Sequence, residues 1–364
     1  MNNDAETQEL LMLPWPSRRK LLAREALRYL PLIVRLDAAD KGLLRLHALR
    51  VAITLATSST IGNLETFSAY RSLWVRIYQT RLNEARGDDL LTVDWTLARS
   101  STRSLLSALD ATEHSDKDVI RDAIDPYSFG SPKMEECKIL GEVRGKDLFT
   151  LPLWLSASSL RFGGFEFTVS SINQDYFTSV SGFWRDWYQG FLDGNPLDWE
   201  LQRRVALIDD AIWEAGPEAV AEEIERIRAA YEVERRAAEL EASAQAALQT
   251  TRGIGDNNPP SPIEEALATS DGLTIIWAAA QELKEEAQSE APDKTRVEKA
   301  ISAIVGVLKA SGLWAAKKVD KGLNAAVIAA GTAGGGASVV WITQNSGSLM
   351  EFVKAAEAWL PFLP

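Results

Sequence analysis

The chain has 364 residues, of which 46% are hydrophobic and 25% are charged. This is the composition of a protein that folds around apolar cores, and the length is sufficient for two or three domains. The formal net charge of −12 opposes binding to nucleic acid, because affinity for phosphates comes largely from lysine and arginine. A single cysteine, Cys137, excludes an internal disulfide.

Residues 1–124 carry apolar side chains at helical spacing. The polar opening from Met1 to Glu9 and the prolines at positions 14 and 16 do not form an export signal, so we expect synthesis in the cytoplasm. From Ser17 to about Thr112 the pattern predicts three or four amphipathic helices, with turns at Asp37–Asp40, Ser58–Asn63 and Gly87–Leu90. The apolar stripes include Leu22, Ala26, Leu30 and Ile33, then Leu43, His47, Val51 and Leu55, then Tyr70, Trp74, Ile77 and Leu82. We interpret this region as an N-terminal helical bundle.

Residues 125–249 are richer in aromatic side chains. The segment Arg161–Val169 contains Gly163-Gly164 between apolar residues, which predicts a short strand or hairpin arm. The aromatic residues that follow recur at spacings of three, four and seven and predict a helix with an aromatic face. They are Phe183, Trp184, Trp187, Tyr188 and Phe191. After a break at Asn195-Pro196, the next helical pattern consists of Leu201, Val205, Ile208 and Ile212.

A long helix is predicted to begin at Gly216-Pro217, because proline is favoured at the first helical position. It continues to about Leu248. Its apolar residues thin out into alanine after Tyr231, which predicts a projecting or loosely packed distal part. Ion pairs are expected on its solvated side, as in Glu232 with Arg236.

A linker is predicted at residues 250–262, which include Asn257, Asn258, Pro259 and Pro260. These four residues either form a plain linker or serve as a recognition peptide. Ser261-Pro262-Ile263-Glu264 has the residues of a helix start and opens a helical tail at 263–364. A second tail helix is predicted from about Asp293, and a last short one from Glu351 to Leu360. The fold class is therefore mainly α, with a multi-helix, bundle-like body and a separate helical C-terminal tail.

The tail contains an uncharged run, Gly322–Met350, that is rich in alanine and glycine and is 29 residues long. A bilayer-spanning helix needs about 20 apolar residues, so this length permits insertion. The abundance of Ala, Gly, Ser and Thr makes insertion only marginally favourable. The residues assigned to a membrane segment are Gly331, Gly335, Val339, Val340, Trp341 and Ile342. The alternative is a buried tail helix followed or preceded by a Gly/Ser-rich loop.

Two stretches carry a resemblance: the first runs from Phe183–Tyr188 through Asp209–Val220, and the second is the linker Arg252–Pro260. The chain resembles a group of uncharacterised proteins of alphaproteobacteria that are often associated with plasmids or prophages. That group usually has histidine at the position of Asp256, so a role resting on this side chain does not transfer. The resemblance implies a helical body joined by this linker to a variable helical tail, and it implies no activity.

Few residues offer catalytic or metal-binding chemistry. The only histidines are His47, expected on or beside a packed face, and His114, expected to be exposed. Cys137 follows two glutamates, which oppose a reactive thiolate, and we expect no zinc site. Asp209-Asp210 are interpreted as surface or capping charges, because adjacent helical side chains do not face each other. The glycines from Gly331 to Gly336 lack the Lys-Ser or Lys-Thr of a phosphate loop.

These observations leave three hypotheses for function. The first is a non-enzymatic, accessory or regulatory protein that binds a protein partner or itself through helical surfaces, without a cofactor. The second is a membrane-acting effector or anchor whose Ala/Gly-rich segment inserts into the inner membrane. The third is an unfamiliar enzyme that depends on carboxylates alone.

Overall fold

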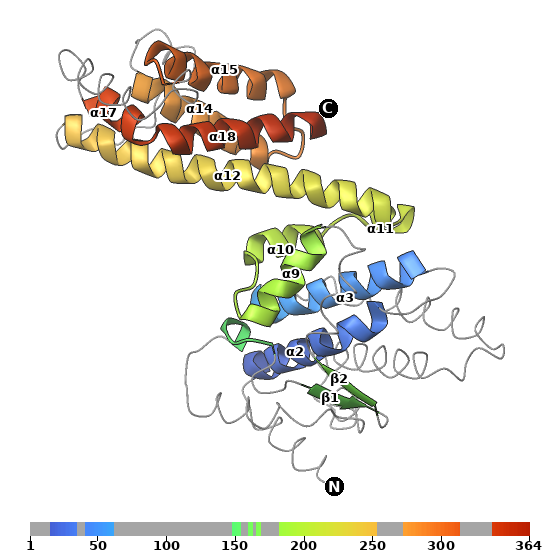
Figure 1. Ribbon diagram of the computed structural model, residues 1–364. Helices are drawn as coiled ribbons and strands as arrows, with labels where there is room; N and C mark the ends of the chain where they lie inside the picture. The colour runs from blue at the N-terminus through green and yellow to red at the C-terminus, as the bar shows by residue number, and fades with distance from the viewer. Residues whose placement is uncertain are drawn as a thin grey trace. The chain divides into compact units, whose positions relative to one another are not determined.

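The computed structural model describes residues 15–34, 41–61, 148–153, 159–162, 165–168, 182–252, 272–313 and 337–364. Within these ranges the protein is mainly α-helical, with one short two-stranded hairpin (Figure 1). This confirms the prediction that the fold is mainly α. The predicted linker at residues 253–262, together with Cys137 and His114, lies outside the described residues.

The chain divides into two compact units, residues 1–224 and residues 225–364. The division falls inside helix α12 (Pro217–Arg252), a single helix of 36 residues. The sequence analysis predicted the domain boundaries elsewhere, at residue 125 and in the linker that begins at residue 250. The helix continues through Thr250 and Arg252, which we had assigned to that linker. Each unit is described by itself below.

The first unit contains two neighbouring helices, α2 (Trp15–Val34) and α3 (Lys41–Ile61), which lie side by side (Figure 1). Every residue of α3 from position 46 to position 59 is buried. A helix that is buried on all sides lies in a core rather than on a surface. The predicted turn at Ser58–Asn63 begins too early, because α3 continues to Ile61. The hydroxyls of Ser58 and Ser59 donate back to carbonyls three residues earlier, so both buried hydroxyls have a partner within the helix.

Two buried arginines of α2 hold the segment 148–153, which begins with the short helix η2 (Leu148–Thr150). Arg24 donates to the carbonyl oxygens of Leu148, Leu151 and Pro152 at 2.7, 2.9 and 2.7 Å. Arg28 donates to the carbonyl of Leu153 at 3.0 Å from Nε and 2.7 Å from Nη2. The carbonyls supply the hydrogen-bond acceptors that the two buried guanidinium groups need. We call this arrangement the arginine clamp.

The helix α9 (Gly182–Asp193) carries the predicted aromatic stripe, and all five of its aromatic side chains are buried. Phe191 meets Phe149 of η2 edge to face, with ring centroids 5.4 Å apart. Trp187 donates from its indole to Gln202 at 2.8 Å, so its one polar atom is satisfied. The aromatic stripe therefore forms part of the core of the first unit. Its rings are buried and do not offer a surface on which nucleic-acid bases could stack.

The segment 148–153 also contacts α9 through its backbone. The Leu153 amide donates to the carbonyl of Phe191 at 2.9 Å. Gly194, just after α9, has φ of +69° and lies against residues 150–152 so closely that a Cβ would come within 2.7 Å of the Leu151 carbonyl carbon. Only glycine suits this position, because it alone has neither the steric penalty at positive φ nor a Cβ.

The helical pattern from Leu201 to Ile212 forms two helices, α10 (Trp199–Ala206) and α11 (Asp210–Ala215). Asp209 separates them, because its carboxylate accepts from the Ala211 amide at 2.8 Å and so caps a new helix. This confirms the interpretation of Asp209 as a capping charge. Gly216 then has φ of 107°, and Pro217 begins α12 as predicted.

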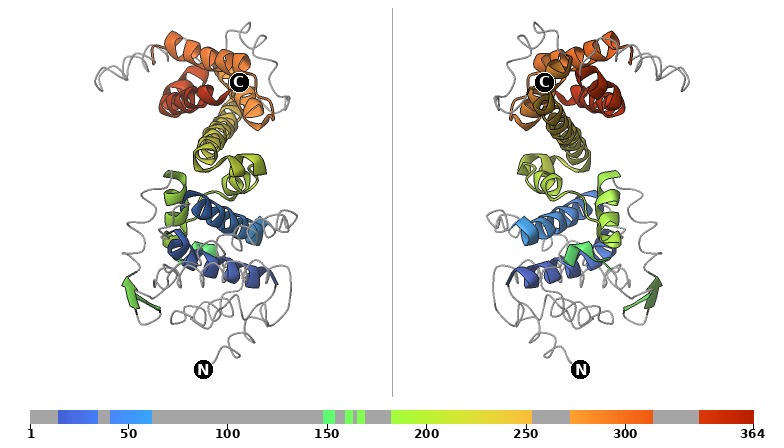
Figure 2. Two further views of the ribbon diagram at one scale, coloured as in Figure 1. Left: turned by 90° about the vertical axis from the view of Figure 1, so that its right-hand side faces the viewer. Right: turned by 90° about the vertical axis from the view of Figure 1, so that its left-hand side faces the viewer.

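The only strands in the described residues are β1 (Ser159–Phe162) and β2 (Phe165–Thr168). They pair antiparallel, with Ser159 opposite Thr168 and Phe162 opposite Phe165. Figure 2 shows them as a separate two-stranded element at the edge of the first unit. The predicted hairpin arm is therefore present, and Gly163-Gly164 lie between the two strands in the sequence.

In the second unit, the part of α12 that we expected to project is packed instead. Ala230, Val233, Ala237 and Leu240 belong to one apolar core together with residues of four other helices. These are α14 (Gly272–Gln288), α15 (Lys294–Ala310), α17 (Ala337–Gln344) and α18 (Ser346–Trp359), which is followed by η4 (Leu360–Phe362). Figure 2 shows the orange and red helices gathered along the C-terminal part of α12. The small alanines allow this close packing.

Polar contacts fix the helices of the second unit relative to one another. Lys284 of α14 pairs with Glu241 of α12 at 2.8 Å, and Trp341 of α17 donates to Ser243 at 2.9 Å. Glu286 is 3% exposed and accepts from the Asp293 amide at 2.7 Å and from the Arg296 guanidinium. The helix α15 begins where it was predicted, at about Asp293, and the Asp293 carboxylate caps it.

Replacing Ala237 tests whether α12 is packed at this position. We expect Ala237→Gln to lower the free energy of unfolding by about 2 kcal/mol or more, because it overfills a closed core and buries an amide. Ala242→Gln is the matched control, since Ala242 lies on the same helix and is exposed. The control should change stability by less than about 0.5 kcal/mol. Urea denaturation measures the free energy of unfolding of both variants. Equal losses of stability would mean that this part of α12 projects into solvent.

Candidate functional site

Polar side chains follow one stripe of the buried helix α3. His47, Arg50, Thr54 and Thr57 recur at helical spacing, and all four are at most 6% exposed. Polar groups are rarely buried in this way unless they are paired or serve a purpose. The helix α10 packs against α3, so part of this stripe lies between two helices of the first unit.

The Arg50 guanidinium joins α3 to α11. It forms an ion pair with the Asp210 carboxylate, and its Cζ lies 4.9 Å from the centre of the Trp213 ring. Arg50 is 1% exposed and Trp213 is fully buried. The indole face and the carboxylate together stabilise a charge that is costly to bury alone. Asp210 is therefore a structural partner of Arg50.

His47 is buried one helical turn before Arg50. Burial lowers its pKa from 6.5 to about 4, and the positive charge of Arg50 acts in the same direction. The imidazole is therefore neutral at pH 7. The prediction that His47 lies on a packed face is confirmed.

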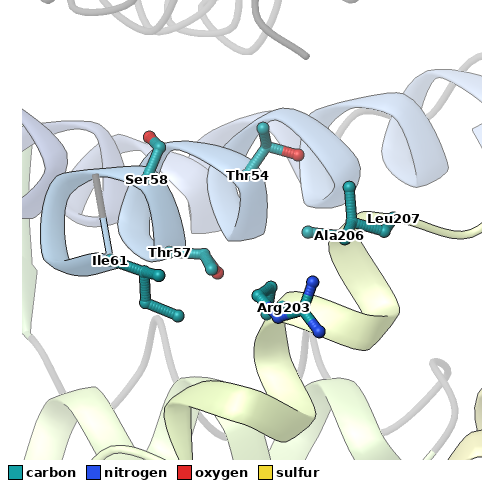
Figure 3. Close-up of a pocket in the computed structure, with 7 residues that line it drawn as sticks. All are labelled: Thr54, Thr57, Ser58, Ile61, Arg203, Ala206 and Leu207. Atoms are coloured by element: carbon teal, nitrogen blue, oxygen red, sulfur yellow. The ribbon is translucent and has the colours of Figure 1, made fainter. Parts of the chain in front are cut away.

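A small recess that is partly open to solvent lies between α3 and α10 (Figure 3). The Thr57 side chain points from α3 toward Arg203 of α10, whereas the Ser58 hydroxyl points the other way and donates to the Leu55 carbonyl. The Thr54 and Thr57 hydroxyl oxygens have no hydrogen-bond partner among the described residues. The residues that line the pocket are Thr54, Thr57, Ser58, Ile61, Arg203, Ala206 and Leu207.

The charged side of the pocket is an ion pair within α10. Arg203 donates to both carboxylate oxygens of Glu200, at 2.7 and 2.8 Å. These hydrogen bonds hold the pKa of Glu200 below its usual value and raise the pKa of Arg203. Arg204 also donates to Glu200, at 3.0 Å. The Arg203 charge is thus compensated by a carboxylate on its own helix.

The rim of the pocket is apolar and accessible. Ile61 is 44% exposed and Leu207 is 42% exposed. Both are among the three exposed large hydrophobic residues in the part of the chain that the structure describes, and the third is Val340. Two such residues from different helices therefore flank one pocket.

Sequence reasoning did not find this pocket. Thr54 and Thr57 occur in an apolar helical stretch, and Arg203 and Leu207 are about 150 residues further along the chain. The one available signal was the cluster of hydroxyl residues from Thr57 to Thr60, and the last three of these residues fall in the predicted turn.

The residues assigned to a membrane segment are only partly described. Trp341 and Ile342 are buried in the core of the second unit, and Val340 is 42% exposed. Val339 lies on α17, while Gly331 and Gly335 lie outside the described residues. Among the helices that the structure describes, none combines the length and the apolar character that crossing a membrane requires.

The described residues contain no group of three or more His, Cys, Asp or Glu side chains that could hold a metal ion. No protein-family model, curated protein or solved structure matches this chain. The candidate site is therefore defined by its own geometry, as a mixed polar and apolar pocket between α3 and α10.

The state of His47 predicts how stability depends on pH. Because the folded pKa is below the unfolded value of 6.5, the stabilisation is complete above about pH 6.5 and is lost as the pH falls toward 4. The slope from this one group is at most about 1.4 kcal/mol per pH unit. Urea denaturation between pH 7 and pH 4 should show a weaker pH dependence for His47→Gln than for the wild type.

His114→Gln is the matched control, since His114 is the only other histidine in the sequence. The His114→Gln variant should keep the pH dependence of stability that arises from His47. In NMR titrations, the imidazole signal that disappears in His47→Gln should titrate near pH 4. Titration of that signal near pH 6.5 would contradict the burial of His47.

Proposed function

We propose that this protein is a non-enzymatic interaction protein, accessory or regulatory in role, that binds a protein partner through the surface around the α3–α10 pocket. The single observation that carries the proposal is the rim: Ile61 and Leu207 expose apolar surface on both sides of a recess with buried hydroxyls. Apolar anchors next to a few fixed polar groups are typical of recognition surfaces.

The chemistry of the lining residues favours binding over catalysis. Thr54 or Thr57 would need a neighbouring general base to act as a nucleophile. The only ionisable side chain that lines the pocket is Arg203, whose raised pKa keeps it protonated. The pocket can therefore position a group by hydrogen bonds, and its lining offers no acceptor for a proton that would have to be removed.

Membrane action of the uncharged run Gly322–Met350 is our second proposal. The exposure of Val340 favours it, because this side chain offers apolar surface to a bilayer. Insertion would have to remove Trp341 and Ile342 from the core and break the hydrogen bond from Trp341 to Ser243. This cost places the membrane hypothesis behind the interaction surface of the first unit.

Photo-crosslinking in cells that naturally make the protein tests the leading proposal. A photoreactive amino acid is placed at Leu207 or at Ile61 in the full-length chain. We expect the same discrete adduct from both positions, with a partner protein or with a second copy, because both side chains flank one site. The exposed Glu214 on α11 is the control position and should give no such adduct. The proposal fails if neither rim position gives an adduct, or if Glu214 gives the same one.

A further inference from the structure

We infer that the hydrogen bond from Trp341 of α17 to Ser243 of α12 is an autoinhibitory latch, which keeps α17 in the core of the second unit until a lipid surface competes for it. This inference rests on the second proposal, membrane action of the uncharged run, and names the regulation of that action. It is carried by the composition of α17, by the contacts of its two buried side chains and by the chemistry of the indole.

The helix α17 has no charged residue in its eight positions, from Ala337 to Gln344. Val340 is 42% exposed, whereas Trp341 and Ile342 are buried. Eight residues are fewer than the about 20 that a spanning helix needs, so we place α17 at the membrane interface. Binding at an interface strengthens with the apolar area that lipid covers. Because α17 carries no charge, it breaks no ion pair of its own when it leaves the protein.

The two buried side chains of α17 contact different helices. Ile342 lies against Gly272 at the start of α14, so closely that a Cβ on this glycine would come within 3.0 Å of Ile342 Cδ1. Trp341 lies beside the C-terminal part of α12 (Figure 1) and donates its indole N–H to the Ser243 hydroxyl at 2.9 Å. By contrast, an ion pair ties α14 to α12. The attachment of α17 therefore depends on apolar contacts and on this hydrogen bond.

A lipid surface replaces part of what the core gives these side chains. Ile342 keeps apolar surroundings, and an indole is favoured at a membrane interface, where its ring is apolar and its N–H reaches polar groups. The hydrogen bond to Ser243, however, exists only while α17 is docked. A lipid surface shifts the balance between docked and released α17 only by its preference for the released state, and the latch opposes that shift. One such hydrogen bond changes an equilibrium by about two- to tenfold.

The test uses the full-length protein and phosphatidylcholine vesicles. An environment-sensitive fluorophore is attached at Val340→Cys in a chain that also carries Cys137→Ser, so that the label has a single site. Its emission should rise when α17 enters lipid. With Ser243 present, half of the protein should enter lipid at a vesicle concentration at least threefold higher than with Ser243→Ala. A label at Glu298→Cys, on the exposed side of α15, should stay in water in both chains.

Further variants separate the latch from a general loss of stability. Ser243→Thr keeps the hydroxyl that accepts the hydrogen bond and should bind lipid as the wild type does. Ser302→Ala is the matched control, because Ser302 lies on the exposed side of α15, and it should also leave lipid binding unchanged. Without vesicles, circular dichroism should give Ser243→Ala the helix content of the wild type, since the apolar core of the second unit is retained.

The latch is rejected if the chains with and without the Ser243 hydroxyl enter lipid at the same vesicle concentration; membrane action would then be retained and only its regulation lost. It is also rejected if the Glu298 label enters lipid together with α17, or if Ser243→Ala loses helix content before lipid is added, because the unit would then open as a whole. If neither chain enters lipid, the membrane proposal itself fails, and the latch with it.

Discussion

The arginine clamp is the interaction on which the first unit depends. Arg24 and Arg28 are almost fully buried, and each places its guanidinium against backbone carbonyls of residues 148–153. Desolvating a guanidinium is costly, and backbone carbonyls of this segment accept its hydrogen bonds here. The same segment inserts Phe149 among the aromatic side chains of α9 and α10. Residues separated by more than 100 positions in the chain are thus joined through one six-residue segment.

The candidate site follows from the burial of α3. This helix is covered by α2 on one side and by α10 on another, and its polar residues must therefore find partners within the fold. Arg50 does so at the start of α11, through Asp210 and Trp213. Thr54 and Thr57, one and two turns further on, line a recess, and their hydroxyls have no hydrogen-bond partner among the residues that the structure describes. The proposed recognition surface is the place where the pairing of this helix is incomplete and where Ile61 and Leu207 remain accessible.

Local patterns in the sequence predicted local structure well. The aromatic spacing of α9, the Gly216-Pro217 start of α12 and the start of α15 near Asp293 depend on residues within a few positions of one another, and all three are present. Features that depend on distant residues could not be predicted. An alanine such as Ala237 has no strong periodic signal, and only the helices packed against it make it core. The clamp and the pocket both join side chains more than 100 residues apart, and no motif marks Arg24 or Thr57 as their members.

Hydrogen exchange measured by mass spectrometry on the wild type and on Arg24→Met tests most directly whether the clamp organises the first unit. Methionine retains an apolar stem of similar length and removes the donors to Leu148, Leu151 and Pro152. The account predicts that peptides from α2, residues 148–153 and α9 lose protection together, while peptides from α14 and α15 exchange as in the wild type. Loss of protection confined to residues 148–153, with α2 and α9 unchanged, would contradict it.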